Sequence, residues 1–136
     1  MTVIVCLSDG GGMTFNKRRQ SRDAAVTENI ENLVCDGALF ISDFSLSLFS
    51  ESKLSVIAAT DPLSAASSGD FVFLEDRGVG KHVPKMEGLV IYRWNRRYPS
   101  DLRFDTDPEK IGMKLSDVIE FTGNSHEKIT REIWIW

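Results

Sequence analysis

Cysteine and histidine are scarce in this sequence, with two of each among its 136 residues. Cys6 falls in a predicted strand and Cys35 at the end of a predicted helix, so we expect both to be small buried apolar residues. Their separation and their places in regular elements argue against a zinc site and disfavour a disulfide. Two cysteines without any other stabilising link favour a reducing environment, and we expect a cytoplasmic protein.

Long hydrophobic runs are missing as well. No stretch approaches the roughly 18 apolar residues that a membrane-spanning helix needs, so we expect no membrane segment. The first residues lack a basic stretch followed by a long apolar run, so we expect no signal peptide. The formal net charge of −4 gives no overall attraction to nucleic acid or to an anionic membrane. Nucleic acid is therefore a disfavoured partner, although a local basic patch could still bind one.

The composition that remains is that of an ordinary globular protein, with 42% hydrophobic and 26% charged residues. That balance argues against disorder. A chain of this length suits one domain, which we expect to span residues 1–136, and it can bury roughly two-thirds of its unfolded surface. It therefore needs neither a metal nor a disulfide in order to fold.

A glycine-rich segment after the first predicted strand is the best candidate for a binding site. The strand Thr2–Leu7 is almost continuously apolar and rich in β-branched residues, as buried strands are. Gly10–Gly12 follow it, at the strand end where ligands usually bind in α/β sheets. The segment then brings several basic side chains and one carboxylate close together. Ser21 is the expected N-cap of the next helix, with Asp23 in its first turn.

Strands and helices alternate along most of the chain. Apolar residues at helical spacing predict a helix from about Ser21 to the stop signal Asp36-Gly37. Short helical segments are expected at Ser45–Phe49 and Leu63–Ser67. Further strands are predicted at Ala38–Ile41, Leu54–Ala58, Phe71–Leu74, Leu89–Trp94, Leu102–Phe104, Lys114–Phe121 and His126–Trp136, the last two joined by the hairpin signal Gly123-Asn124-Ser125. This order predicts an α/β fold with a mostly parallel central sheet and an antiparallel C-terminal hairpin.

The order of elements and several short motifs resemble dihydrofolate reductase over nearly the whole chain. The similar segments are Val3–Leu7, Gly12-Met13-Thr14-Phe15-Asn16, Asp23, Val83-Pro84-Lys85-Met86, Ser100-Asp101-Leu102-Arg103-Phe104, Glu120-Phe121 and Asn124-Ser125-His126. The resemblance implies a dihydrofolate reductase-like fold and a cleft in which one carboxylate acts on a pterin. Asp23 is our candidate for that catalytic carboxylate. Two departures put the cleft in doubt, because Leu102 replaces the bracing threonine and Lys17–Ser21 lacks the family's Pro-Trp.

The segments that hold NADPH in that family are replaced by acidic ones. Leu74-Glu75-Asp76 stands where the resemblance implies a glycine triplet at the cofactor's pyrophosphate. Ser42–Ser45, which includes Asp43, stands where it implies a Gly-Arg-x-Thr segment at the nucleotide phosphates. Carboxylates repel a phosphate rather than hold it. We therefore expect conventional NADPH binding to be absent or badly weakened, and the cofactor is left unknown.

The chain also resembles a group of small bacterial proteins that share Gly-Met-x-Phe-Asn-x-Arg-Arg-Gln-Ser-x-Asp and Tyr-Arg-Trp-Asn. The label ribonuclease Z is sometimes given to that group. A dinuclear zinc hydrolase needs a cluster of the kind His-x-His-x-Asp-His. This sequence has only His82 and His126, neither of them in such a cluster, so we predict no metal site.

Each candidate also has a simpler structural interpretation. Asp23 could merely favour the helix dipole, and the arginines before it could form a solvated loop. His126 could be a general acid or, more commonly, a structural residue at the start of a strand. Serine hydrolase chemistry lacks support, because no serine stands in Gly-x-Ser-x-Gly. A second basic–aromatic group could bind single-stranded nucleic acid or could simply end a strand: Arg93, Trp94, Arg96, Arg97 and Tyr98.

Three functional hypotheses stay open. The first is a dihydrofolate reductase-like protein that has lost NADPH binding and holds another small ligand or a protein partner near Asp23. Its predicted ligand-binding residues are Gly12, Met13, Asn16, Arg18, Arg19 and Arg22. The second is a reductase that uses NAD(P)H or a flavin on a pterin-like substrate, with Asp23 as proton donor. The third and weakest is a nucleic-acid-binding accessory protein. The oligomeric state is open, and the apolar end Ile133–Trp136 packs either on the sheet or in a subunit interface.

Overall fold

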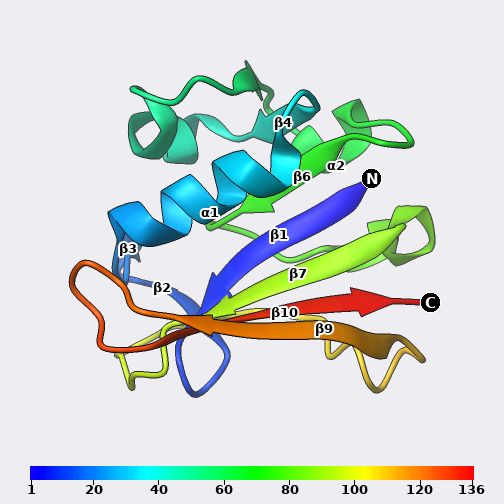
Figure 1. Cartoon of the computed structure of the whole chain (residues 1–136). Helices are drawn as coiled ribbons and strands as arrows, with labels where there is room; N and C mark the ends of the chain where they lie inside the picture. The colour runs from blue at the N-terminus through cyan, green and yellow to red at the C-terminus, as the bar shows by residue number, and fades with distance from the viewer.

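The computed structural model describes all residues from Met1 to Trp136. Its centre is a seven-stranded sheet in the order β5-β4-β6-β1-β7-β10-β9 (Figure 1). The five strands from β5 to β7 are parallel, and β10 lies antiparallel to both β7 and β9. The predicted class, with a mostly parallel sheet and an antiparallel C-terminal hairpin, is confirmed. The strands are β1 (Thr2–Leu7), β4 (Ala38–Ile41), β5 (Ser55–Ala58), β6 (Phe71–Leu74), β7 (Gly88–Arg93), β9 (Lys114–Phe121) and β10 (Ile129–Ile135).

β1 lies at the centre because it is apolar on both faces. Val3, Val5 and Leu7 enter one hydrophobic cluster, whereas Ile4 enters the cluster on the other face. This alternation follows from the two-residue period of a strand. Burying each such side chain contributes about 1.5–3 kcal/mol, so the sheet and its two clusters hold the fold together.

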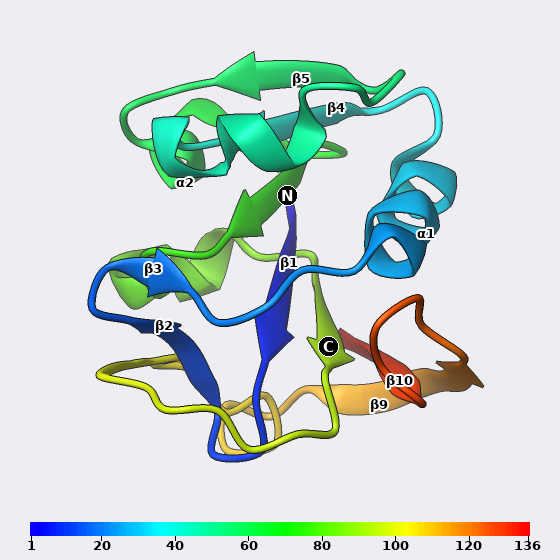
Figure 2. The same cartoon turned by 90° about the vertical axis from the view of Figure 1, so that its left-hand side faces the viewer.

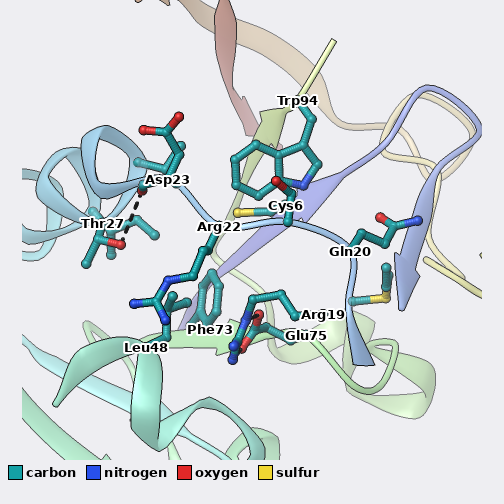
Figure 3. A pocket seen from close by; sticks show the side chains of 14 residues that line it. Cys6, Arg19, Gln20, Arg22, Asp23, Thr27, Leu48, Phe73, Glu75 and Trp94 are labelled. Atoms are coloured by element: carbon teal, nitrogen blue, oxygen red, sulfur yellow. Dashed lines mark hydrogen bonds and ion pairs between the residues drawn. The ribbon is translucent and has the colours of Figure 1, made fainter. Parts of the chain in front are cut away.

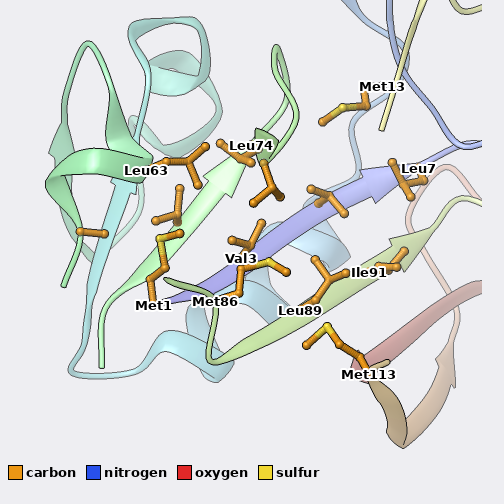
Figure 4. Close-up of a cluster of buried hydrophobic side chains, with 14 residues drawn as sticks. Met1, Val3, Leu7, Met13, Leu63, Leu74, Met86, Leu89, Ile91 and Met113 are labelled. Carbon is orange, nitrogen blue, oxygen red and sulfur yellow. The ribbon is translucent and has the colours of Figure 1, made fainter. Parts of the chain in front are cut away.

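The two faces of the sheet are covered by different elements (Figure 2). α1 (Ala24–Val34) packs Val26, Ile30 and Val34 against one face. The opposite face carries the cluster drawn in Figure 4, to which the short helix α2 (Pro62–Ala65) contributes. No helix of the structure is both long and apolar enough to cross a membrane.

The N-cap of α1 lies two residues later in the chain than expected. It is Asp23 rather than the predicted Ser21, and the Asp23 carboxylate accepts a hydrogen bond of 2.9 Å from the amide of Ala25. Both residue types cap helices well. Asp23 prevails because the same carboxylate also receives hydrogen bonds from a distant loop, as described below.

The other end of α1 also differs from the expectation. The helix ends at Val34, before the predicted stop Asp36-Gly37, because Cys35 adopts a positive φ of 53°. Cys35 is exposed, so the prediction of a buried residue was wrong there, whereas Cys6 is half-buried. Both cysteines are free.

The segment from Gly12 to Arg19, for which no strand was predicted, contributes to a small second sheet. β2 (Gly12–Phe15) pairs antiparallel with β3 (Arg18–Arg19) and with β8 (Leu102–Arg103). Asn16 and Lys17 connect β2 to β3 with φ values of 51° and 59°. Two consecutive left-handed residues are typical of a tight two-residue hairpin turn. Arg18 and Arg19 therefore sit on a strand, whereas Arg22 lies in the connecting segment before α1.

The remaining differences concern connecting segments. The 3-10 helix η1 (Asp43–Phe49) corresponds to the helical turns expected at Ser45–Phe49, and η2 (Gly80–Lys85) falls in a region expected to be a loop. The C-terminal hairpin is present, but β10 begins at Ile129 and leaves His126 in the connecting segment.

The apolar C-terminal end is divided between the sheet and the surface. Trp134 packs against the cluster of Figure 4. Trp136 is about half exposed, and its Nε1 donates to the carbonyl oxygen of Met86 at 2.7 Å. The structure therefore supports the packing interpretation for Trp134 and leaves Trp136 at the surface.

Candidate functional site

A pocket lies where β1 and β6 end, between the start of α1 and the strand β3 (Figure 3). The free space inside it is about 20 Å³, which is room for about one water molecule. Half of its lining is hydrophobic. The lining residues are Cys6, Met13, Arg19, Gln20, Ser21, Arg22, Asp23, Val26, Thr27, Ile30, Leu48, Phe73, Glu75 and Trp94.

One wall of the pocket is an ion pair between Arg19 on β3 and Glu75 directly after β6. The guanidinium donates to both carboxylate oxygens, with 2.7 Å between Nη2 and Oε1. Glu75 also accepts a 2.7 Å hydrogen bond from the hydroxyl of Ser45. Only 8% of Glu75 is exposed, and the Arg19 guanidinium lies over the ring of Phe44. The hydrogen bond to Glu75 raises the pKa of Arg19, so the guanidinium stays charged.

Asp76, the second carboxylate after β6, is also paired with an arginine of the chain. Asp76 accepts hydrogen bonds of 3.2 Å from both Nε and Nη2 of Arg77 and of 3.3 Å from the hydroxyl of Ser42. The hydrogen bond to Asp76 raises the pKa of Arg77. Both carboxylates that follow β6 are thus paired with arginines of the same chain.

Asp23 anchors α1 to the segment before β10. Besides Ala25, its carboxylate accepts hydrogen bonds of 2.9 Å from the amides of Asn124 and Ser125 and from Nδ1 of His126. The Asp23 side chain is fully buried. Burial would raise its pKa, but the hydrogen bonds from His126 and the three amides outweigh that effect and hold the pKa well below its usual range.

The orientation of Asp23 bears on its predicted role. In Figure 3 its carboxylate points away from Leu48 and Phe73 in the pocket. A carboxylate that is ionised at neutral pH has no proton to donate, so these contacts support a structural anchor. Catalysis by Asp23 stays a prediction.

His126 is the centre of a buried polar cluster that was not predicted from the sequence. Its side chain is only 2% exposed, and its ring stacks on Trp94 with 4.7 Å between ring centres. Nε2 lies 2.9 Å from the hydroxyl of Tyr98 and 3.1 Å from that of Ser21. Asp23 and the motif Asn124-Ser125-His126 were both noticed in the sequence, but nothing local indicates that they meet.

Comparison with solved structures identifies the architecture. The chain superposes on the dihydrofolate reductase from Enterococcus faecalis complexed with NADP(H) and RAB-propyl, with a TM-score of 0.68. The match covers 98% of this chain and 94% of that one, at 7% sequence identity. The fold is that of dihydrofolate reductase. No family model and no curated protein sequence matches the chain.

On this dihydrofolate reductase-like fold, the predicted site residues divide between two neighbouring hollows. Met13, Arg19, Arg22 and Asp23 line the pocket of Figure 3. Asn16, Arg18 and Arg19 line an open outer hollow of about 550 Å³, together with Phe15, Gln20, Tyr98 and Pro99. Gly12 lines neither hollow. It packs so closely that an added Cβ would come within 2.5 Å of the Cβ of Ser100.

The second basic–aromatic group is partly used inside the fold. Arg93 forms a bidentate ion pair with Glu132, at 2.8 and 3.0 Å, and Trp94 is buried against His126. Only Arg96 and Arg97 are left as exposed cations. Arg93 and Trp94 are therefore engaged in contacts within the fold.

Proposed function

We propose that this chain is a divergent dihydrofolate reductase-like protein that does not bind NADPH conventionally and instead binds an anionic small ligand in the outer hollow. The observation that carries the proposal is the Arg19–Glu75 ion pair. It places a buried carboxylate, already matched by an arginine, at the strand end where the resemblance implies a glycine-lined pyrophosphate site.

The ion pair supports the loss of conventional cofactor binding by a simple electrostatic argument. A pyrophosphate approaching the end of β6 would meet Glu75 and Asp76, and it could attract Arg19 only by separating it from Glu75. Breaking a buried ion pair costs about 3–5 kcal/mol, because it leaves an unmatched charge. That cost offsets much of what a new phosphate contact would contribute.

The free cations beside this pair support an anionic ligand. Arg18 and Arg22 take part in no ion pair, and both are exposed. Arg18 lines the outer hollow, and Arg22 lines the neighbouring inner pocket. A guanidinium binds carboxylate or phosphate oxygens through two parallel hydrogen bonds. Phe15, which is 42% exposed, and Tyr98 add aromatic surface to the outer hollow.

The relative sizes of the two hollows indicate where the ligand lies. The inner pocket holds about 20 Å³ and the outer hollow about 550 Å³. A pterin ring therefore does not fit the inner pocket in this conformation. Gln20 lines both hollows, and its side-chain amide donates to the hydroxyl of Ser8 and the carbonyl oxygen of Pro99 between them.

A thermal-shift screen tests the proposal. NADPH, NADH, folate and a panel of phosphorylated and carboxylated metabolites are each added at millimolar concentration. A ligand at about 100 times its Kd stabilises the native state by about 2.7 kcal/mol, which raises the Tm by several degrees. We expect such a shift from a member of the anionic panel, and none from NADPH, NADH or folate.

Two variants locate the binding. Arg18→Gln is expected to remove the shift, whereas Arg97→Gln, an equally exposed arginine outside both hollows, is expected to retain it. A shift with NADPH would overturn the proposal in favour of a reductase that uses Asp23 as proton donor. A screen without any hit would contradict small-ligand binding and favour a protein partner.

A further inference from the structure

The polar cluster at the rim of the inner pocket has the connectivity of a serine nucleophile with its general base. Ser21 Oγ lies 3.1 Å from Nε2 of His126, and Nδ1 of the same ring lies 2.9 Å from Oδ2 of Asp23. The lack of a Gly-x-Ser-x-Gly motif does not bear on this arrangement. Such a constellation is recognised by geometry, and not by the position of its members in sequence.

Asp23 fixes the tautomer that a general base requires. An ionised carboxylate only accepts hydrogen bonds, so Nδ1 of a neutral His126 carries the proton and Nε2 presents its lone pair toward Ser21. The amides of Ala25, Asn124 and Ser125 hold the carboxylate in place, and Trp94 stacks on the imidazole ring. The base is thus oriented on every side except the one that faces the hydroxyls.

Ser21 is placed where a substrate can reach it. It lies in the extended segment between β3 and α1, is only half-buried, and lines the inner pocket. The amide N–H groups of residues 20–24 make no hydrogen bond within the protein, and they precede the positive end of α1. They are available to stabilise an oxyanion beside Ser21.

We propose that Ser21 is a nucleophile and His126 its general base in the hydrolysis of short-chain acyl esters, with Asp23 as the positioning residue. The acyl group is short because the inner pocket has room for about one water-sized group. This proposal does not depend on the anion site, since none of its three residues contributes to the outer hollow.

The reaction balances without any cofactor. Ser21 Oγ attacks the ester carbonyl carbon while Nε2 of His126 takes the hydroxyl proton. The carbon–oxygen bond to the leaving alcohol then breaks, and His126 returns the proton to that alcohol. Water attacks the acyl-serine by the same route, which releases the carboxylic acid and regenerates Ser21.

Tyr98 allows a direct test of the proposal, because its hydroxyl competes with that of Ser21 for the lone pair on Nε2 of His126. The Tyr98 hydroxyl lies 2.9 Å from Nε2, closer than Ser21 does. Tyr98→Phe removes the competitor and leaves Nε2 to Ser21 alone. If His126 is the base, this variant acylates faster than the wild type, by severalfold.

The experiment is acylation of the full chain by 4-nitrophenyl acetate. Release of nitrophenolate measures the rate, and peptide mass spectrometry locates the acetyl group. We expect one acetyl group on Ser21 in the native protein, and none there in protein unfolded in urea. Ser21→Ala is expected to lower the nitrophenolate burst by about 100-fold or more. Ser116→Ala, a change at an exposed serine on the edge strand β9, is expected to leave the burst unchanged.

The contrary outcomes are equally definite. Acetyl groups scattered over lysines and other serines, or a Ser21→Ala burst equal to that of the wild type, would overturn the assignment. An unchanged or slower burst in a folded Tyr98→Phe variant would do so as well. His126→Gln removes buried hydrogen bonds and can unfold the chain, so the test relies on Ser21 and Tyr98, which are only half-buried.

Discussion

Nδ1 of His126 lies 2.9 Å from Oδ2 of Asp23, although 103 residues separate them in the chain. This contact joins the N-cap of α1 to the segment that leads into β10, two elements that otherwise pack on different parts of the sheet. The same carboxylate had been expected to face a pterin cleft. Its position in the fold makes it first of all a link between the beginning and the end of the chain.

Asp23→Asn should destabilise the protein by about 3 kcal/mol. The change removes the charge that receives hydrogen bonds from His126 and three amides, and hydrogen bonds to charged groups contribute about 1.5–3 kcal/mol in addition to the cap. Urea unfolding followed by circular dichroism measures the loss. Asp61→Asn is the matched control, because Asp61 caps α2 at an exposed site. Equal losses for the two variants would show that the contacts with residues 124–126 contribute nothing.

The stability of the wild-type chain should fall in acid through the same residue. The pKa of Asp23 is lowered in the folded state, so the unfolded state binds the proton first and gains relative to the native state as the pH decreases. The contribution is fully present at neutral pH, well above the unfolded pKa of about 4, and is lost progressively below about pH 5. Thermal melts from pH 7 to pH 3 measure this slope.

Asp23→Asn supplies the control for the acid effect. The variant cannot lose a charge that it does not have, so its Tm should decline less steeply over this range than that of the wild type. Parallel curves for the two proteins would place the acid sensitivity elsewhere, for example at Glu87, whose pKa is lowered to about 2 chiefly by its hydrogen bond with the amino group of Met1.

The strands could be predicted from the sequence because their signal is local. Val3–Leu7 and Phe71–Leu74 are apolar without interruption, and such runs form buried strands almost regardless of their neighbours. The hairpin β2–β3 could not be predicted from the sequence, because it is short and polar and its turn depends on two non-glycine residues with positive φ. The glycines make the turn after β1, where Gly11 has a φ of 77°, but the hairpin turn itself is made by Asn16 and Lys17.

The candidate site could be predicted only in part. Arginines 18, 19 and 22 were identified by their charge, but the sequence does not indicate that Arg19 is held by Glu75 across 56 residues. The cluster around His126 depends on contacts with Trp94, Tyr98 and Ser21 that no periodicity encodes. A contact of this kind is decided by the packing of whole elements, which a local pattern does not contain.

Arg19→Gln should destabilise the chain by about 3 kcal/mol, because it leaves the carboxylate of Glu75 buried without its cation. Arg18→Gln, one residue away on the same strand but exposed, should change the stability by less than about 0.5 kcal/mol. The double change Arg19→Gln with Glu75→Gln should recover much of the loss, since no unmatched charge then remains. Urea unfolding of the wild type, Arg19→Gln, Glu75→Gln and the double variant forms a double-mutant cycle. A coupling energy near zero would show that the pair does not stabilise the wall of the pocket.

Lys17→Gly should stabilise the protein by about 0.5–1 kcal/mol. Lys17 has a φ of 59° and Asn16 one of 51°, and the hairpin turn that joins β2 to β3 favours asparagine followed by glycine. Glycine adopts this conformation without the steric cost that an ordinary side chain bears there. Lys17→Val should do the opposite, because a β-branched residue is strained at positive φ. Chemical unfolding compares both variants with Lys53→Gly, a change in a connecting segment away from this turn. If glycine and valine affected stability equally at position 17, the turn would not govern the register that places Arg18 and Arg19 beside the outer hollow.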